Sequence, residues 1–142
     1  MPIGALGRVA VYGLREGSDL IEGAVTLSRQ ANFDYALITC IGSLKETVLG
    51  FYDGDTRSYK QLEIKKHVEL VSLSGLLSKD ESGMPNLHIH AVVSDSEFRC
   101  YAGHLIRGKV GYLVELYLTE ISGTEVVKVK DPSTGLTHIR NE

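Results

Sequence analysis

The hydrophobic pattern of this chain is mostly that of β-strands. Runs rich in Val, Ile, Leu and Tyr recur along the chain, and clusters of Gly, Asp and Ser separate them. Alternation with a period of two, or a short continuous apolar run between turn residues, is typical of strands. Most of the chain is therefore predicted to be β. The predicted strands lie within residues 8–14, 33–40, 46–53, 59–66, 67–75, 86–93, 97–103 and 112–121.

One segment, residues 18–32, has the spacing of a helix instead. Asp19 can cap its start, Glu22 follows three residues later, and Asn32 suits its end. The pattern therefore predicts one amphipathic helix. A second, weaker helical turn, or equally a loop, is expected at residues 43–46. The apolar positions on one face of the main helix are Leu20, Ala24, Leu27 and Ala31.

Length and charge narrow the class of protein. The 142 residues are the size of one domain, and 43% are apolar and 23% charged, as in soluble globular proteins. The 15 basic residues against 18 acidic ones give a formal net charge of -3. The densest basic spots, Lys65–Lys66 and Lys128–Lys130, are too short for a phosphate-binding stripe. DNA is therefore a doubtful partner.

The chain has no sign of a membrane segment. No stretch approaches the length of a membrane span, and no charged region precedes a long apolar run at the N-terminus. Cys40 and Cys100 are both flanked by strand-like residues, which favours buried free thiols over a disulfide framework. We therefore expect a cytoplasmic protein in a reducing compartment.

Three of the five histidines lie close together in "NLHIHAVVSDSEFRCYAGHL", residues 86–105. Residues i and i+2 of a strand share a face, so His88 and His90 should present their imidazoles side by side. They could converge on one ion with bonds of roughly 2.1 Å. Without a third ligand, such a pair is more often a solvated strand face than a metal site.

The third candidate ligand is His104, and hairpin register decides whether it joins the pair. A two-residue turn at Asp95–Ser96 would place His104 opposite Leu87, on the wrong side of the sheet. A bulge or strand exit at 102–103 would turn His104 toward the pair, and glycine tolerates such a kink. We therefore expect Gly103 to supply a backbone bend that completes a three-histidine metal site.

Three neutral imidazoles favour Zn²⁺ or another borderline divalent ion and leave a coordination position for water or substrate. A metal there could lower the pKa of bound water to about 7. Glu69, inside an apolar strand, is the candidate general base, although a carboxylate in such a strand more often points to solvent. No Ser-His-Asp or Cys-His arrangement is recognisable, so no catalytic residue is assigned.

Four segments together resemble, in order and spacing, the plants-and-prokaryotes conserved (PPC) domain. They are "IGSLKETVLGFYD", "HVELVSLSG", "LHIHAVVSD" and "YAGHLIRGKVGYLVELYL". In that family a His-x-His motif is followed by Gly-Gly-His, whereas this sequence has Ala102-Gly103-His104. The likeness runs from about Arg8 to the C-terminal "DPSTGLTHIR" and extends over nearly the whole chain.

The resemblance implies a single α+β domain over residues 1–142, with a core at about 8–122 and a C-terminal strand and tail at 123–142. The expected architecture is a mostly antiparallel sheet of about seven strands with one main helix packed on it. The resemblance also implies a homotrimer and a divalent metal, with zinc as the first expectation, on His88, His90 and His104. The AT-hook of plant relatives is missing, as in stand-alone prokaryotic members.

Two functions follow from these observations. The first is a homotrimeric divalent-metal-binding domain with a three-histidine site and a small-molecule pocket, whose reaction is not assigned. The alternative is a DNA-binding or regulatory interaction module of the same family, in which the histidines are structural. Binding to duplex DNA would separate the two, because binding through phosphate neutralisation weakens as salt rises.

Overall fold

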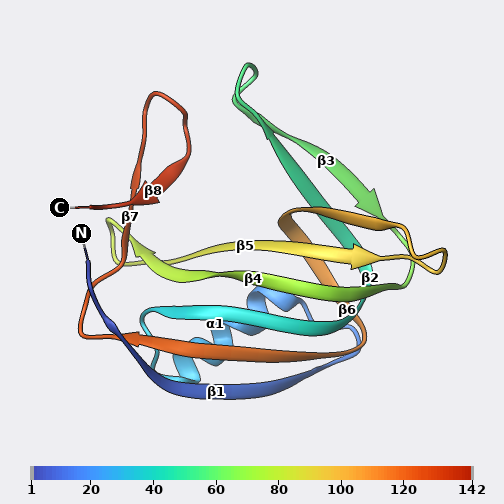
Figure 1. Ribbon diagram of the computed structural model, residues 1–142, viewed down its shortest axis with the longest axis horizontal. Helices are drawn as coiled ribbons and strands as arrows, with labels where there is room; N and C mark the ends of the chain where they lie inside the picture. Colours follow the sequence, from blue (N-terminus) through green and yellow to red (C-terminus); the bar gives the residue numbers. More distant parts are fainter. Residues whose placement is uncertain (1, 142) are drawn as a thin grey trace.

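The computed structural model describes residues 2–141, which form eight strands and one α-helix (Figure 1). This confirms the predicted α+β fold with one main helix, and the sheet has eight strands where about seven were expected. The elements in chain order are β1 (Ala5–Arg15), α1 (Leu20–Ala31), β2 (Ala36–Asp53), β3 (Ser58–Ile64), β4 (Val68–Asp80), β5 (Pro85–Ser94), β6 (Cys100–Ser122), β7 (Val127–Lys130) and β8 (Thr137–Ile139).

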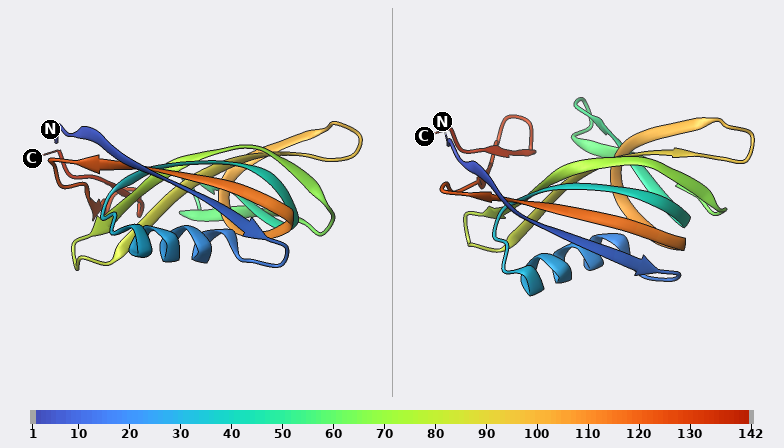
Figure 2. Two further views of the ribbon diagram at one scale, coloured as in Figure 1. Left: turned by 90° about the horizontal axis from the view of Figure 1, so that it is seen from below. Right: turned by 60° about the horizontal axis from the view of Figure 1, so that its bottom comes forward.

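Four strands of the sheet pair in a closed cycle. β2 pairs with β6, β6 with β5, β5 with β4, and β4 again with β2, all of them antiparallel. β1 lies along β6, β3 along β2, and β7 runs parallel to the end of β4 before β8 turns back on it. The result is one strongly curved sheet with α1 along one side of it (Figure 2).

Local signals place the helix where the sequence predicts it. The Asp19 carboxylate accepts a hydrogen bond from the backbone N–H of Glu22 at 2.9 Å, which satisfies a free donor of the first turn. Asn32 ends the helix in the left-handed conformation, with φ 58° and ψ 48°, as Asn tolerates at this position. Leu20 and Ala24 are buried against the sheet. The predicted helix is confirmed at both ends.

Residues 43–46, expected as a helical turn or a loop, are instead part of the 18-residue strand β2. Both edges of this strand are paired here, with Ser43 opposite Glu69 of β4 and Leu44 opposite Val110 of β6. The Ser43 hydroxyl also accepts a hydrogen bond from the backbone N–H of Tyr112 at 2.8 Å. Pairing with distant strands therefore overrides the local turn signal.

Apolar side chains on the inner face of the sheet pack with α1 into one core. In β5 the core residues Ile89, Ala91 and Val93 are at most 2% exposed, and the residues between them point to the opposite, outer face. The core also includes Leu105 of β6. The curved sheet therefore has an apolar inner face and a more polar outer face on which β5 can present functional groups.

The two cysteines differ in their surroundings. Cys40 is buried in β2, as expected, and burial raises the pKa of its thiol to about 12. Cys100 is exposed, so the expectation of burial was wrong for it, because β6 begins at this residue at the end of an exposed loop. Within residues 2–141, no helix is long and apolar enough to cross a membrane.

Candidate metal centre

β5 supplies two of the three candidate ligands and directs them away from the core. Ile89 and Ala91 are each 2% exposed, whereas His88 and His90 are exposed. Because side chains alternate along a strand, both imidazoles emerge on the outer face. Their Nε2 atoms are 3.2 Å apart and their ring centroids 5.0 Å apart. The two rings therefore converge as the spacing predicts.

His104 reaches the same face through a register that differs from the expected one. It lies directly opposite His90 in the antiparallel pair of β5 and β6. The connection is the five-residue loop Asp95–Arg99, not a two-residue turn at Asp95–Ser96. The longer loop shifts the partner of His104 along β5 from Leu87 to His90, and this shift spans an odd number of residues. An odd shift exchanges the two faces of a strand, so His104 turns toward the pair without a bend.

Gly103 therefore has a different role from the one expected. It pairs with Ala91, and the ladder through this pair has no register shift, so the predicted bulge was wrong. A Cβ on Gly103 would lie 2.8 Å from the backbone oxygen of Gly50, and Gly50 of β2 in turn pairs with His104. The missing side chain lets β6 lie close against β2. Gly103 thus permits tight strand packing beside the site.

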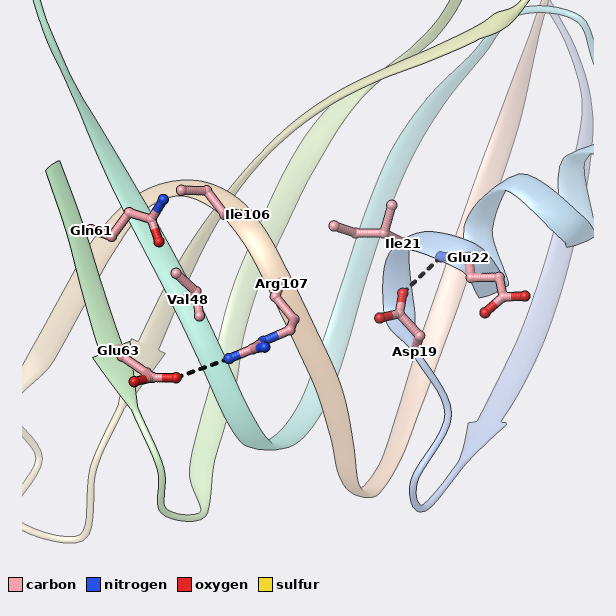
Figure 3. A pocket seen from close by; sticks show the side chains of 8 residues that line it. All are labelled: Asp19, Ile21, Glu22, Val48, Gln61, Glu63, Ile106 and Arg107. Atoms are coloured by element: carbon pink, nitrogen blue, oxygen red, sulfur yellow. Dashed lines mark hydrogen bonds and ion pairs between the residues drawn. The ribbon is translucent and has the colours of Figure 1, made fainter. Parts of the chain in front are cut away.

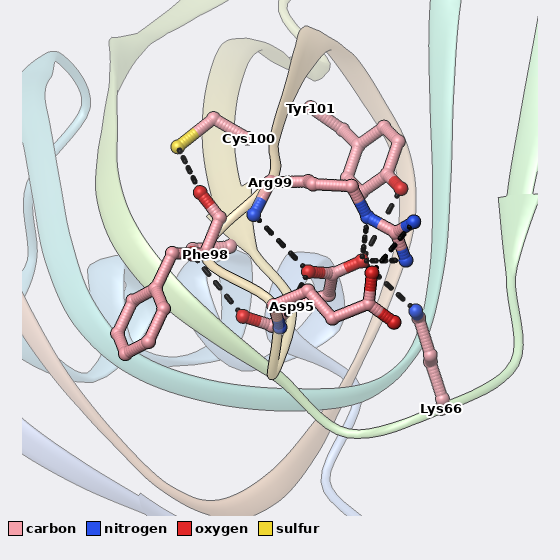
Figure 4. A network of polar contacts seen from close by, with 8 residues as sticks. Lys66, Asp95, Phe98, Arg99, Cys100 and Tyr101 are labelled. Atoms are coloured by element: carbon pink, nitrogen blue, oxygen red, sulfur yellow. Dashed lines mark hydrogen bonds and ion pairs between the residues drawn. The ribbon is translucent and has the colours of Figure 1, made fainter.

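A buried carboxylate holds the loop that sets this register (Figure 4). The Asp95 side chain has no exposed area, and burial without partners would be costly. Its Oδ2 lies 2.8 Å from the Arg99 guanidinium and 3.0 Å from Lys66 Nζ. The Arg99 guanidinium, with Lys66 and backbone N–H groups, holds the pKa of this carboxyl far below its usual range. The other donors are Tyr101 Oη and the backbone N–H groups of Glu97 and Arg99.

Asp95 is thus a residue that sequence reasoning took only as a turn residue. The available signal was an Asp with an Arg four residues later, since this spacing allows the side chain to bond the loop that it begins. The contact with Lys66, 29 positions earlier in the chain, has no such local signal. The loop geometry therefore depends partly on a distant residue.

The three imidazoles form one compact cluster. Each offers one ring nitrogen such that all three nitrogens lie within 4.8 Å of one another. The His104 ring centroid is 5.4 Å from that of His88 and 5.5 Å from that of His90. Ligand nitrogens roughly 2.1 Å from a tetrahedral zinc ion are about 3.4 Å apart, so small ring rotations would bring all three onto one ion. Tyr59 of β3 stacks on His104 with centroids 5.0 Å apart, which restrains that ring.

Desolvation favours the neutral form of two of these rings, which is the form that binds metal. Burial is the main cause that lowers the pKa of His104, with smaller contributions from His88 and His90. His88 is exposed as a whole, but partial desolvation of its ring is the main cause that lowers its pKa, followed by the charges of Lys128 and His90. Nδ1 of His104 is enclosed and has no hydrogen-bond partner among the described residues. An enclosed nitrogen without a partner is unfavourable, and a bound cation or an ordered water would relieve that cost.

Glu69, the candidate general base, does not join the cluster. It lies in β4 opposite Ser94, which is four residues along β5 from His90, or about 13 Å at about 3.3 Å per residue. Its exposed side chain lines a separate hollow of about 220 Å³ together with His67 and Tyr112. The structure therefore agrees with the other expectation for Glu69, a carboxylate that points to solvent.

A hollow of about 320 Å³ opens beside the histidines. Its lining includes His88, His104, Tyr59 and Asn86 from the sheet, and the segment 135–137 that leads into β8. This volume is at the small end of the range for pockets that hold metabolites. The cluster therefore has space on one side for a small molecule.

A larger hollow, of about 800 Å³, lies elsewhere on the molecule (Figure 3). Asp19 at the start of α1 lies on one side, and Glu63 of β3 and Arg107 of β6 lie on the other. The Arg107 guanidinium and the Glu63 carboxylate form an ion pair of 2.9 Å. No histidine lines this hollow, so it is separate from the candidate metal centre.

Comparison with known proteins identifies the family. The family model of the Plants and Prokaryotes Conserved (PCC) domain matches residues 1–122, most of the chain and all three clustered histidines. The chain belongs to this family. The resemblance to this family is thereby confirmed, and the C-terminal hairpin of β7 and β8 lies beyond the matched residues of this PCC domain.

Two solved structures are similar to this PCC domain over nearly its full length. One is a plant- and prokaryote-conserved (PPC) protein from Pyrococcus horikoshii, with 27% identity and a TM-score of 0.91 over 99% of this chain and 96% of that one. The other is the metal-containing protein AF0104 from Archaeoglobus fulgidus, with 27% identity and a TM-score of 0.89 over 99% of both chains. The whole fold is therefore shared with both.

A curated relative has a much longer chain. The bifunctional protein GlmU from Synechococcus sp. (strain JA-3-3Ab) is 29% identical over 140 residues, which cover 96% of this chain and 21% of that protein. The PCC domain thus spans about a fifth of the length of this relative. The similarity concerns that fifth alone.

Proposed function

We propose that this PCC domain is a homotrimeric metal-binding protein that holds a divalent ion, zinc in the first instance, on His88, His90 and His104. The proposal is carried by three ring nitrogens within 4.8 Å of one another, in a cluster where one enclosed nitrogen lacks a partner among residues 2–141. The donor set supports zinc, because neutral imidazoles suit borderline divalent ions. The similar protein AF0104 is metal-containing, which also supports it.

The residues around the cluster suit a site that is open on one side. A bound zinc ion supplies Lewis acidity and lowers the pKa of a bound water. Tyr59 holds the His104 ring by stacking, and the hollow of about 320 Å³ gives a small molecule access to the histidines. Among the described residues the cluster contains no carboxylate, so no general base is proposed. The proposed role is metal binding with an adjoining small-molecule pocket.

Zinc titration of protein stripped with a chelator tests the metal site. The wild type is expected to bind one ion per chain, whereas His90→Ala and His104→Ala should bind at least about a hundredfold more weakly because each removes a ligand. His138→Ala is the matched control, since His138 is exposed in β8 and lies outside the cluster. Zinc affinities of the two cluster variants equal to that of wild type would reject the site.

Exposed apolar side chains support the proposed self-assembly. Val9 and Val11 of β1 are 61% and 62% exposed, and Leu113 of β6 is 54% exposed. Apolar groups of this size on a sheet surface are typical of contact faces, and the family resemblance makes the number of copies three. Sedimentation equilibrium is expected to give the trimer mass at micromolar concentration. A monomer mass would reject assembly, and a dimer mass would reject the stoichiometry.

Charge argues against the alternative function, DNA binding. The net charge is -3, and ten of the 15 Lys and Arg side chains already form ion pairs with carboxylates. Binding to phosphates would have to compete with those pairs. Fluorescence anisotropy with duplex DNA at physiological salt should therefore detect negligible affinity. Sub-micromolar, salt-dependent binding would favour the DNA-binding alternative.

A further inference from the structure

The hollow of about 220 Å³ that Glu69 lines is rich in aromatic rings, because His67, Tyr112 and Phe98 also line it. The rings of His67 and Tyr112 are stacked, with centroids 4.5 Å apart and an angle of 19° between their planes. Tyr112 is 67% exposed and Phe98 is 88% exposed, so neither ring serves the core. Aromatic side chains usually stabilise a protein by burying their large area. A ligand in the hollow would cover two rings that the fold leaves in solvent.

Contacts with the strands hold the stacked pair in place. The backbone N–H of Tyr112 in β6 donates to the Ser43 hydroxyl of β2 at 2.8 Å. A Cβ on the neighbouring Gly111 would lie 3.0 Å from Nδ1 of His67 and 3.1 Å from Oγ of Ser43, which is tighter than an ordinary van der Waals contact. The glycine therefore lets the His67 ring lie close against β6, next to Tyr112. The two rings form a fixed wall of the hollow.

Phe98 lines the hollow at a cost in backbone strain. Its φ is 61°, in the left-handed region that residues other than Gly, Asn and Asp rarely adopt. Its N–H donates to the Asp95 carbonyl at 2.9 Å, and its ring points away from the polar network of the Asp95 side chain (Figure 4). Strained positions of this kind cluster at ligand-binding sites. An exposed phenylalanine at such a position therefore supports a role for the ring in binding.

The charge beside the rings is negative. Among the described residues that line the hollow, Glu69 and Asp95 carry carboxylates and none is a lysine or arginine. Arg99 and Lys66 neutralise Asp95. Within residues 2–141 the exposed Glu69 side chain forms no hydrogen bond or ion pair, and strand pairing places it beside Ser43, which also lines the hollow. One unpaired carboxylate thus lies next to three aromatic rings.

We propose that this hollow binds a methylated ammonium group, held by the rings of Tyr112, His67 and Phe98 and by the Glu69 carboxylate. The negative faces of aromatic rings attract a cation, and quaternary ammonium ligands are recognised in this way. The free carboxylate adds attraction for a cation and disfavours an anion. The lining is mostly apolar, so a primary ammonium would lose hydrogen bonds to water there, whereas a trimethylammonium group has no N–H donor to leave unpaired.

Choline and neohexyl alcohol, in which a carbon atom replaces the ammonium nitrogen of choline, test the proposal. The two molecules have the same shape and differ in one charge. In titrations of the whole chain followed by ligand NMR, choline is expected to bind at least about tenfold more tightly. Trimethyl-lysine amide carries the same head group on a protein side chain. Tighter binding of this amide than of choline assigns the head group to a protein partner, and tighter binding of choline assigns it to a free small molecule.

Variants of the lining locate the binding. Tyr112→Leu and Glu69→Gln should each weaken choline binding at least about fivefold. Tyr117→Leu and Glu97→Gln are the matched controls, because both residues lie outside the lining of the hollow, and each should bind choline as wild type does. Phe98→Gly should weaken choline binding without lowering the melting temperature, because glycine adopts the left-handed conformation freely.

Three outcomes overturn the proposal. The first is equal affinity for choline and neohexyl alcohol, which would mean that the hollow is merely apolar. The second is no detectable binding of choline, or binding that Tyr112→Leu and Glu69→Gln both leave unchanged. The third is an equal loss of affinity in Glu97→Gln and Glu69→Gln, since choline would then respond to the net charge of the protein. Zinc-loaded and chelator-stripped protein should bind choline equally, because no histidine of the metal cluster lines this hollow.

Discussion

Polar groups lie at both ends of the β5–β6 hairpin, but only at one end do they all have hydrogen-bond partners. At the loop end, the buried Asp95 carboxylate accepts hydrogen bonds from Lys66, Arg99 and backbone N–H groups. At the other end, the ring nitrogens of three histidines face one another, and an enclosed nitrogen of His104 has no partner in the described part of the chain.

This difference separates a structural network from a binding site. Buried polar groups are normally paired, so a complete network such as that of Asp95 needs nothing further to be stable. An incomplete cluster is retained at a cost, and a ligand that completes it recovers that cost on binding. The loop end is therefore expected to contribute stability, and the histidine end to contribute binding. Four predictions test this division, from the largest expected effect to the smallest.

Asp95→Ala should destabilise the protein most. It removes the buried carboxylate that Arg99, Lys66 and backbone N–H groups of this loop share, so the melting temperature is expected to fall by about 10 °C. The register of β5 and β6 is then held less firmly, and zinc affinity should fall at least about tenfold. Circular dichroism and zinc titration measure the two effects. Glu97→Ala is the control, since its ion pair with Arg99 is exposed and worth little. A melting temperature unchanged in Asp95→Ala would show that the network is not structural.

Gly103→Val tests the packing of the strand that carries His104. Its side chain would meet the backbone oxygen of Gly50, so the free energy of unfolding should fall by about 2 kcal/mol, and zinc should bind more weakly because His104 is displaced. Gly13→Val is the matched control, because a Cβ on Gly13, also in a strand, meets nothing within 4 Å. Urea denaturation of both variants gives the comparison. Equal stability of the two would contradict the close approach of β6 and β2.

Lowering the pH should reduce the free energy of unfolding of the metal-free protein, because His88 and His104 titrate. The pKa values of His88 and His104 are lowered in the folded chain and rise to about 6.5 on unfolding. Well above pH 6.5 both imidazoles are neutral in the folded and in the unfolded chain, so their titration takes nothing from the free energy of unfolding. As the pH falls from 6.5 through the lower folded values, the unfolded chain binds more protons and stability is lost. Urea denaturation at pH 7.5, 6.5 and 5.5 measures this, and His104→Gln should reduce the loss. An identical loss in that variant would contradict the assignment.

Of the four variants and conditions, His104→Phe should change stability least, but it should abolish zinc binding. Phe keeps an aromatic ring against Tyr59 and removes the enclosed nitrogen without a partner, so the metal-free protein should gain about 0.5–1 kcal/mol. Zinc binding should be lost with the ligand. Urea denaturation after chelation and zinc titration measure the two quantities, and exposed His138→Phe is the control. A large loss of stability in His104→Phe would mean that the histidines are structural.

Sequence reasoning succeeded where the relevant residues lie within one turn or one strand. Asp19, Glu22 and Asn32 signal the ends of α1 within a few positions of them, and the helix begins and ends there. The shared face of His88 and His90 follows from the alternation of a single strand. Hairpin register with a bend at Gly103, and then the family resemblance, predicted His104 as the third ligand, and the structure brings it to the same cluster. For His104 the predicted neighbours were correct, and the predicted route through Gly103 was not.

The sequence by itself determined most of the strands, the helix with its caps and the outward face of the β5 histidines, because each depends on neighbours along the chain. Only the tertiary structure decided the register of β6, the separation of Glu69 from the cluster and the burial of Lys128. Register depends on the loop that Asp95 builds with Lys66, 29 positions away, and Lys128 is buried where β7 pairs with the end of β4. Such contacts between distant residues leave no periodic trace in the sequence, since periodicity records only which face of its own element a residue occupies.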